Sequence, residues 1–179
     1  MIGAAAALGA ALALGACGSS HITSDASANN NGVYISLNGL DYQLQVSREL
    51  NPFSPEDHGY LTGLAATPPT AQQIWYGVFL RALNASHQSR TTAASFDIRD
   101  TQGNVYYPTP LNPATNEYVW TAQTLQPLGT EPASDTTASF GPTQGGLVLF
   151  KLNNSVYANR PLTLDIHSGS STATISLDL

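Results

Sequence analysis

Residues 162–179 read LTLDIHSGSSTATISLDL, and this stretch gives the clearest fold signal in the chain. Apolar residues alternate with polar ones through Leu162, Leu164 and Ile166, and the alternation resumes from Ala173 onward. A period of two sends one set of side chains into a core and the other into water, as in a half-buried β-strand. The stretch therefore predicts two strands, each with one buried face.

The same reasoning predicts further strands upstream. Tyr42, Leu44 and Val46 are separated by polar residues and should share one face of a strand. Two other segments, 74–83 (IWYGVFLRAL) and 147–152 (LVLFKL), are apolar at almost every position. A strand that is apolar on both faces is typical of the centre of a sheet, so we expect both segments to be central strands.

Turn signals separate the predicted strands. Asn38-Gly39 suits a tight hairpin, and residues 100–104 (DTQGN) place Asp and Gly at turn positions between two short strands. Segments 51–70 and 108–142 are rich in Pro, Thr and Ala and should be irregular. Seven to nine short strands joined in this way predict an all-β protein with an antiparallel β-sandwich.

The composition excludes several classes of protein and partner. Charged residues make up only 10% of the chain, and Lys151 is the sole lysine. Helix surfaces usually draw on Glu, Lys and Arg, so this composition argues against a helical protein. The formal net charge is −6, and the sequence shows no basic patch. We therefore expect neither nucleic acid as a partner nor electrostatic attraction to anionic lipid headgroups.

The N-terminal segment predicts export and a lipid anchor. Residues 1–16 are apolar and uncharged, which is short for a membrane-spanning helix of ~20 residues but suits a signal peptide. The sequence Leu14-Gly15-Ala16-Cys17 resembles a bacterial lipobox, in which the cysteine is acylated on sulfur and becomes the mature N-terminus. Two alternatives stay open: a cleaved signal with an incidental cysteine, and an uncleaved anchor.

The segment after the lipobox predicts a tether and then one domain. Residues 17–32 are small and polar, so we expect a lipidated and flexible tether, followed by a single domain over residues 33–179. A lipid on Cys17 would also explain why an exported chain has one cysteine, since an odd thiol otherwise implies an intermolecular bond or a free group. The expected location is extracytoplasmic, on the cell membrane.

Three segments of the predicted domain resemble a group of small exported bacterial proteins. Residues 75–84 (WYGVFLRALN) match W-x-G-V-F-L-x-x-x-N, residues 96–106 (FDIRDTQGNVY) match F-x-[LI]-x-D-x-x-G-x-x-Y, and residues 159–164 (NRPLTL) match N-R-P-L-x-L. The group is similar to the immunoglobulin-like domains called telomeric-repeat-binding-factor-2-like. The resemblance implies an immunoglobulin-like sandwich on an extracytoplasmic lipoprotein, and it implies no catalytic residues.

Metal-ligating patterns are weak in this sequence. The histidines are isolated and show no H-x-H, H-x-x-H or H-E-x-x-H spacing: His21, His58, His87 and His167. A zinc site needs three or four convergent ligands, so we expect no metal and no cofactor. Residues 97–104 contain Asp, Gly and Asn but lack the EF-hand pattern. A turn in which Asp100 caps backbone N–H groups is the favoured interpretation.

Catalytic patterns are equally weak. Ser54, Asp57 and His58 lie too close together in one loop to form a triad, and no G-x-S-x-G elbow occurs. We therefore predict no catalytic residues. Arg48 is one of few charges in the chain, and we expect it to pair with a carboxylate and pin the following long loop onto the sheet. The alternative is that the charges around Arg48 mark a ligand-facing edge.

Aromatic residues are the expected contact surface. Tyr106, Tyr107, Tyr118 and Trp120 are close enough in sequence to gather at one end of a sandwich, and aromatic residues are enriched at binding surfaces. The expected function is a non-enzymatic module that binds a protein or polysaccharide of the cell envelope. A purely structural or accessory module and, less favoured, a hydrolytic or carbohydrate-active enzyme are the alternatives.

Overall fold

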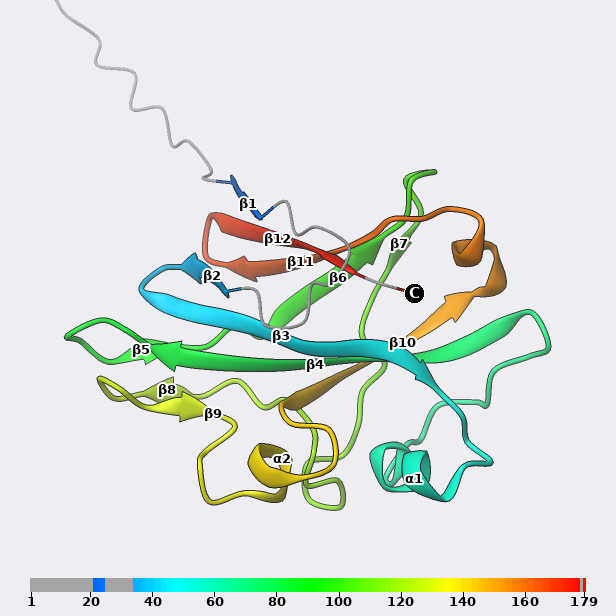
Figure 1. The fold of residues 1–179 in the computed structure, drawn as a ribbon, viewed down its shortest axis with the longest axis horizontal. Coiled ribbons are helices and arrows are strands. Elements are labelled where there is room, and N and C mark those ends of the chain that lie inside the picture. The colour runs from blue at the N-terminus through cyan, green and yellow to red at the C-terminus, as the bar shows by residue number, and fades with distance from the viewer. Residues whose placement is uncertain (1–20, 25–33, 178) are drawn as a thin grey trace, which may run out of the picture.

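A computed structural model describes residues 21–24, 34–177 and 179, which fold into two packed β-sheets (Figure 1). Within these residues, strand β1 pairs in parallel with β12, and the other strand pairs are antiparallel. The predicted all-β antiparallel sandwich is therefore confirmed. The predicted signal peptide and Cys17 lie outside the described residues.

Each sheet combines strands that are distant in sequence. Sheet I has the order β1 (His21–Ser24), β12 (Ser171–Leu177), β11 (Leu162–Ser168), β6 (Ser95–Arg99) and β7 (Val105–Tyr106). Sheet II has the order β10 (Gly146–Asn153), β4 (Gln73–Asn84), β3 (Leu40–Leu50) and β2 (Tyr34–Leu37), with β9 (Thr130–Glu131) also paired to β4. The remaining elements are the ribbon of β5 (Arg90–Thr91) and β8 (Thr124–Leu125), α1 (Pro55–His58), α2 (Thr137–Phe140), and the 3₁₀ turns η1 (Gly59–Leu61) and η2 (Asn154–Tyr157). Eight of the described strands have four or more residues, in line with the predicted seven to nine.

Sheet II is buried on both faces because its central strand, β4, is apolar on both. Tyr76, Val78 and Leu80 belong to the core between the sheets, whereas Trp75 and Phe79 belong to a second cluster on the opposite face. The loops that carry α1 and α2 lie on that opposite side of sheet II in Figure 1. The prediction that residues 74–83 form a central strand is confirmed, because β4 lies between β10 and β3.

Strand β10 differs from the prediction of a central strand, because it ends the order of sheet II. Its outer edge is nevertheless occupied by the irregular segment that carries Tyr118 and Trp120. The backbone N–H of Leu147 donates to the Tyr118 carbonyl at 2.7 Å, and the N–H of Trp120 donates to the Leu147 carbonyl at 2.9 Å. A covered edge removes the exposed pairing surface that an apolar end strand would otherwise present.

A β-bulge in β3 overturns part of the predicted alternation. The pairing of β3 with β4 shifts between Leu44 and Val46. Tyr42 and Leu44 belong to the core between the sheets, but Val46 packs on the outer cluster that contains Phe79. An extra residue in one strand reverses which face the following side chains take. The prediction that all three share one face is therefore wrong for Val46.

The predicted hairpin and the predicted tether have different outcomes in the structure. The predicted hairpin at Asn38-Gly39 is confirmed, with φ values of 52° and 82° that a tight two-residue turn between β2 and β3 requires. His21–Ser24 form β1 beside β12, although we expected a flexible tether there. The open edge of β12 offers unpaired backbone groups that can recruit such a segment. Among the described residues, no helix is both long and apolar enough to cross a membrane.

Candidate functional site: a carboxylate and histidine cluster on sheet I

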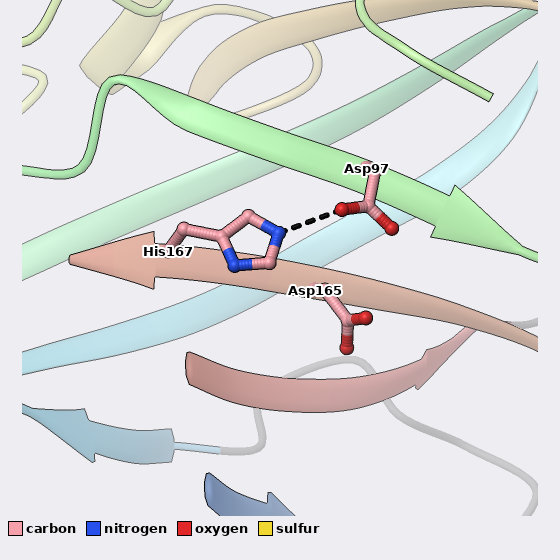
Figure 2. A group of neighbouring side chains, drawn as sticks. All are labelled: Asp97, Asp165 and His167. Atoms are coloured by element: carbon pink, nitrogen blue, oxygen red, sulfur yellow. Dashed lines mark hydrogen bonds and ion pairs between the residues drawn. The ribbon is translucent and has the colours of Figure 1, made fainter. Parts of the chain in front are cut away.

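The face of sheet I that is turned away from the core carries three ionisable side chains that lie together. Asp97 on β6 is the direct cross-strand partner of Asp165 on β11. His167 follows Asp165 by two positions, so the alternation of a strand places all three side chains on one face. We call Asp97, Asp165 and His167 the Asp–His cluster, and Figure 2 shows the ring of His167 directed at Asp97.

Both ring nitrogens of His167 are engaged. Nε2 lies 2.6 Å from Oδ2 of Asp97, and Nδ1 lies 3.0 Å from Oγ1 of Thr172 on β12. In the neutral ring with its proton on Nε2, that nitrogen donates to the carboxylate and Nδ1 accepts from the hydroxyl. Contacts at both nitrogens fix the plane of the ring above the sheet.

The two carboxylates share a counter-ion. Nε of Arg99 lies 3.1 Å from Oδ1 of Asp97 and 3.0 Å from Oδ2 of Asp165. The exposed fractions are only 6% for Asp97 and 4% for Asp165, and like charges directly opposite on paired strands destabilise a sheet. The hydrogen bond to Asp97 and the charge of Asp165 raise the pKa of Arg99. Oδ1 of Asp165 also accepts a hydrogen bond from the Thr174 hydroxyl at 2.5 Å.

The arrangement corrects the expectation that the chain has no convergent metal ligands. One donor atom from each member of the Asp–His cluster lies within 4.8 Å of the other two. An imidazole nitrogen and carboxylate oxygens are ligands of zinc and of other first-row divalent metals. The signal in the sequence was Asp165-Ile166-His167, because two potential ligands at i and i+2 in a strand share a face. The third ligand, Asp97, comes from a strand whose register no sequence spacing reveals.

The four aromatic candidates do not form one exposed patch, which corrects that expectation. Tyr106 and Trp120 are buried in the core between the sheets, and the indole N–H of Trp120 donates to a backbone carbonyl at 2.8 Å. Tyr118 packs against Tyr60 on the outer face of sheet II, with ring centroids 4.7 Å apart. Tyr107 alone among the four is exposed, at 71%. Three of the four rings therefore pack into two separate apolar clusters instead of meeting at one surface.

Two expectations about local contacts are confirmed. Arg48 pairs with Asp57 at 2.6 Å, and Asp57 also accepts the backbone N–H of Asn51 at 2.8 Å, so α1 is tied to β3. Burial would raise the pKa of Asp57, but these hydrogen bonds and the charge of Arg48 lower it overall. Asp100 caps its turn, since its Oδ1 accepts the backbone N–H groups two and four residues later, each at 2.9 Å.

Comparison with known proteins supports the fold and assigns no activity. No protein-family model and no curated protein matches the chain. The yjhA protein from Bacillus subtilis has a TM-score of 0.50 at 10% identity, over 83% of this chain and 98% of that chain. The ycdA protein from Bacillus subtilis, whose name describes it provisionally as a lipoprotein, has a TM-score of 0.50 at 8% identity, over 83% of this chain and 39% of that chain. An uncharacterized β-sandwich protein from Clostridium difficile is 11% identical, with a TM-score of 0.43 over 83% of this chain and 91% of that chain. At these identities the likeness shows the fold alone.

Proposed function

We propose that the chain is a lipid-anchored extracytoplasmic lipoprotein whose immunoglobulin-like sandwich is a non-enzymatic binding module for a protein or polysaccharide of the cell envelope. The observation that carries the proposal is the sequence Leu14-Gly15-Ala16-Cys17 after an uncharged apolar segment, in a chain with no other cysteine. The β-sandwich that the chain shares with ycdA, described provisionally as a lipoprotein, supports it.

The anchor is tested by replacing the acylated atom. Cys17→Ser should release the protein from the membrane fraction or leave its precursor unprocessed, because serine has no sulfur to accept the lipid. Ala16→Gly is the matched control, since it keeps a small residue before the cysteine and should stay with the membranes. Fractionation and a mass measurement of the mature N-terminus report both variants. If Cys17→Ser partitions with membranes like the natural protein, the lipid anchor is wrong.

Apolar surface, rather than charge, is proposed to make the contact with the envelope. Six basic and twelve acidic residues in 179 provide little charge to steer a partner. The ring of Tyr107 is exposed, and a pocket of about 210 Å³ opens beside Trp120 and Phe96. Binding to envelope preparations should therefore change little between low and high salt.

Tyr107→Ala should weaken that binding by about tenfold or more, on the scale of an interface hot spot. Tyr34→Ala is the matched control, because Tyr34 is a similarly exposed tyrosine on β2 of the other sheet. Steep loss of binding with salt, together with unchanged affinity in Tyr107→Ala, would argue against aromatic recognition. No binding to any envelope fraction would favour the structural or accessory module instead.

A further inference from the structure

We propose that the Asp–His cluster is a binding site for a divalent transition metal, with zinc as the best fit, and that Arg99 takes the place of the ion when no metal is bound. This inference is independent of the proposed lipid anchor and of envelope binding. It rests on the placement, charge and surroundings of Asp97, Asp165 and His167.

The placement of the three ligands follows from two adjacent antiparallel strands. Asp165 and His167 are at i and i+2 on β11, and Asp97 is opposite Asp165 on β6. Directly opposed residues have Cβ atoms about 4.5–5.5 Å apart, so side chains of this length can converge on one point above the sheet. The donor atoms already lie within 4.8 Å of one another. Ligands bonded to one tetrahedral ion at about 2.0–2.2 Å lie about 3.4 Å from one another. The Nε2–Oδ2 pair of His167 and Asp97, now 2.6 Å apart, would therefore separate slightly, and side-chain rotation would bring any more distant donor closer.

The charge of the site favours a divalent cation over the present arrangement. Asp97 and Asp165 are both more than nine-tenths buried and together carry two negative charges, but they share the single positive charge of Arg99 through one nitrogen, Nε. A buried charge that is not fully compensated is costly. A divalent ion would balance both carboxylates. The Arg99 side chain is 52% exposed, so it can turn into solvent and leave the position between the carboxylates free.

The residues around the ligands are those that a metal site needs. Nε2 of His167 faces Asp97 and would bind the ion without its proton, which Nδ1 would then carry and donate to the Thr172 hydroxyl on β12. The Thr174 hydroxyl donates to Asp165. Such outer contacts orient the ligands and raise metal affinity. One nitrogen and two carboxylate ligands with an open fourth position suit zinc. Calcium prefers six to eight oxygen ligands and should bind poorly here.

Titration of the full chain with zinc chloride alone tests the proposal. The protein is purified without a histidine tag and carries Cys17→Ser, so that no added imidazole and no thiol contributes. Isothermal titration calorimetry should show one zinc ion per chain, and zinc should raise the melting temperature. Calcium chloride should produce neither effect. The matched control is His58→Gln. His58 is an exposed histidine on α1, and α1 lies on the side of sheet II that faces away from sheet I (Figure 1). Its loss should leave zinc binding unchanged.

Two variants should move zinc affinity in opposite directions. His167→Gln removes a ligand and should weaken binding by more than about tenfold, whereas Arg99→Gln removes the competing cation and should tighten it. The opposed result keeps the test decisive even if His167→Gln folds poorly. Absence of saturable zinc binding, binding that survives His167→Gln, or binding that Arg99→Gln weakens would each overturn the proposal.

Discussion

The outer faces of the two sheets are stabilised in different ways. On sheet II, the outer-face side chains Trp75, Phe79 and Leu147 are at most 2% exposed. The loops that carry α1 and α2 lie on this side of the sheet (Figure 1). On sheet I, the outer face carries the ionisable Asp97 and Asp165, which are held by hydrogen bonds and by one shared arginine. One face is made stable by covering apolar groups, and the other by pairing charged ones.

Only one of the two kinds of strand pattern requires a covering loop. A strand that is apolar on both faces leaves one face unpaired in a two-layer sandwich, so something outside the sandwich must bury it. The long segments 51–70 and 108–142 provide that cover for sheet II. An alternating strand needs no cover, but buried carboxylates on its polar face need partners. Substitutions should therefore act through packing on sheet II and through charge on sheet I.

The largest expected effect is the loss of packing at Phe79 on the covered face. The sequence places Phe79 in the two-sided apolar strand, and its side chain is fully buried against the ring of Tyr60, 5.0 Å away between centroids. Phe79→Ala should lower the free energy of unfolding by about 3–5 kcal/mol, through lost burial and the cavity left behind. Urea denaturation monitored by circular dichroism measures it.

The matched substitution on the other sheet is Thr163→Ala. Thr163 is half-buried on β11 and is the register partner of Arg99. Its loss should cost less than about 1 kcal/mol, the span of strand propensity at a solvated face. Equal costs for the two variants would show that the outer faces do not differ in packing, and the comparison would fail.

Much of this fold could be predicted because strand periodicity is a local property. Alternation located β11 and β12, and Asn38-Gly39 located the hairpin before β3, since only residues that tolerate positive φ fit such a turn. The bulge before Val46 could not be predicted, because an extra residue in a strand leaves no mark on composition. Strand β1 was missed because its pairing depends on the open edge of a distant strand.

The candidate site could be predicted only in part from the sequence. Alternation with Ile166 places His167 on the polar face of its strand, but its partner Asp97 lies 70 residues away in sequence. Register between distant strands decides which side chains meet, and no single-chain pattern encodes it. The aromatic patch failed for a related reason: Trp120 follows a proline-rich loop, yet it fills the space between the sheets because an indole ring gains more from burial than from exposure there.

Glu131 is a buried carboxyl group that, unlike those of the Asp–His cluster, is paired with a neutral amide. Glu131 on β9 is 5% exposed and is hydrogen-bonded to the side-chain amide of Gln123 rather than to a positive charge. Burial raises the pKa of Glu131 to about 7, despite an opposing backbone hydrogen bond from Thr121. The unfolded chain ionises this group near 4.5. Stability should therefore fall as the pH rises from about 4.5 to 7, by up to about 3 kcal/mol.

Glu131→Gln should remove that dependence, because the amide keeps the shape and an acceptor for Gln123 but cannot ionise. The difference in unfolding free energy between the variant and the natural protein should grow in favour of the variant across this pH range. Other titrating groups cancel in the difference. A difference that stays constant with pH would mean that Glu131 is ionised in the folded state at no cost.

A smaller effect than that of Glu131 is expected at the contact that ties α1 to sheet II. Asp57→Asn weakens the pairing with Arg48 and should cost about 1–2 kcal/mol at neutral pH, because the partly exposed Arg48 is screened while Asp57 is buried. The pKa of Asp57 is lowered in the folded protein, so its contribution is present above the unfolded value of 3.8 and is lost as the pH falls through the lower folded value. The natural protein and the variant should thus converge in stability at acidic pH.

Glu56→Gln is the control. It removes the neighbouring exposed carboxylate and should change stability by less than about 0.5 kcal/mol at any pH. Hydrogen exchange should locate the effect of Asp57→Asn in residues 51–61 and leave sheet I unchanged; faster exchange in β6 or β11 would show that the two outer faces are coupled rather than independent.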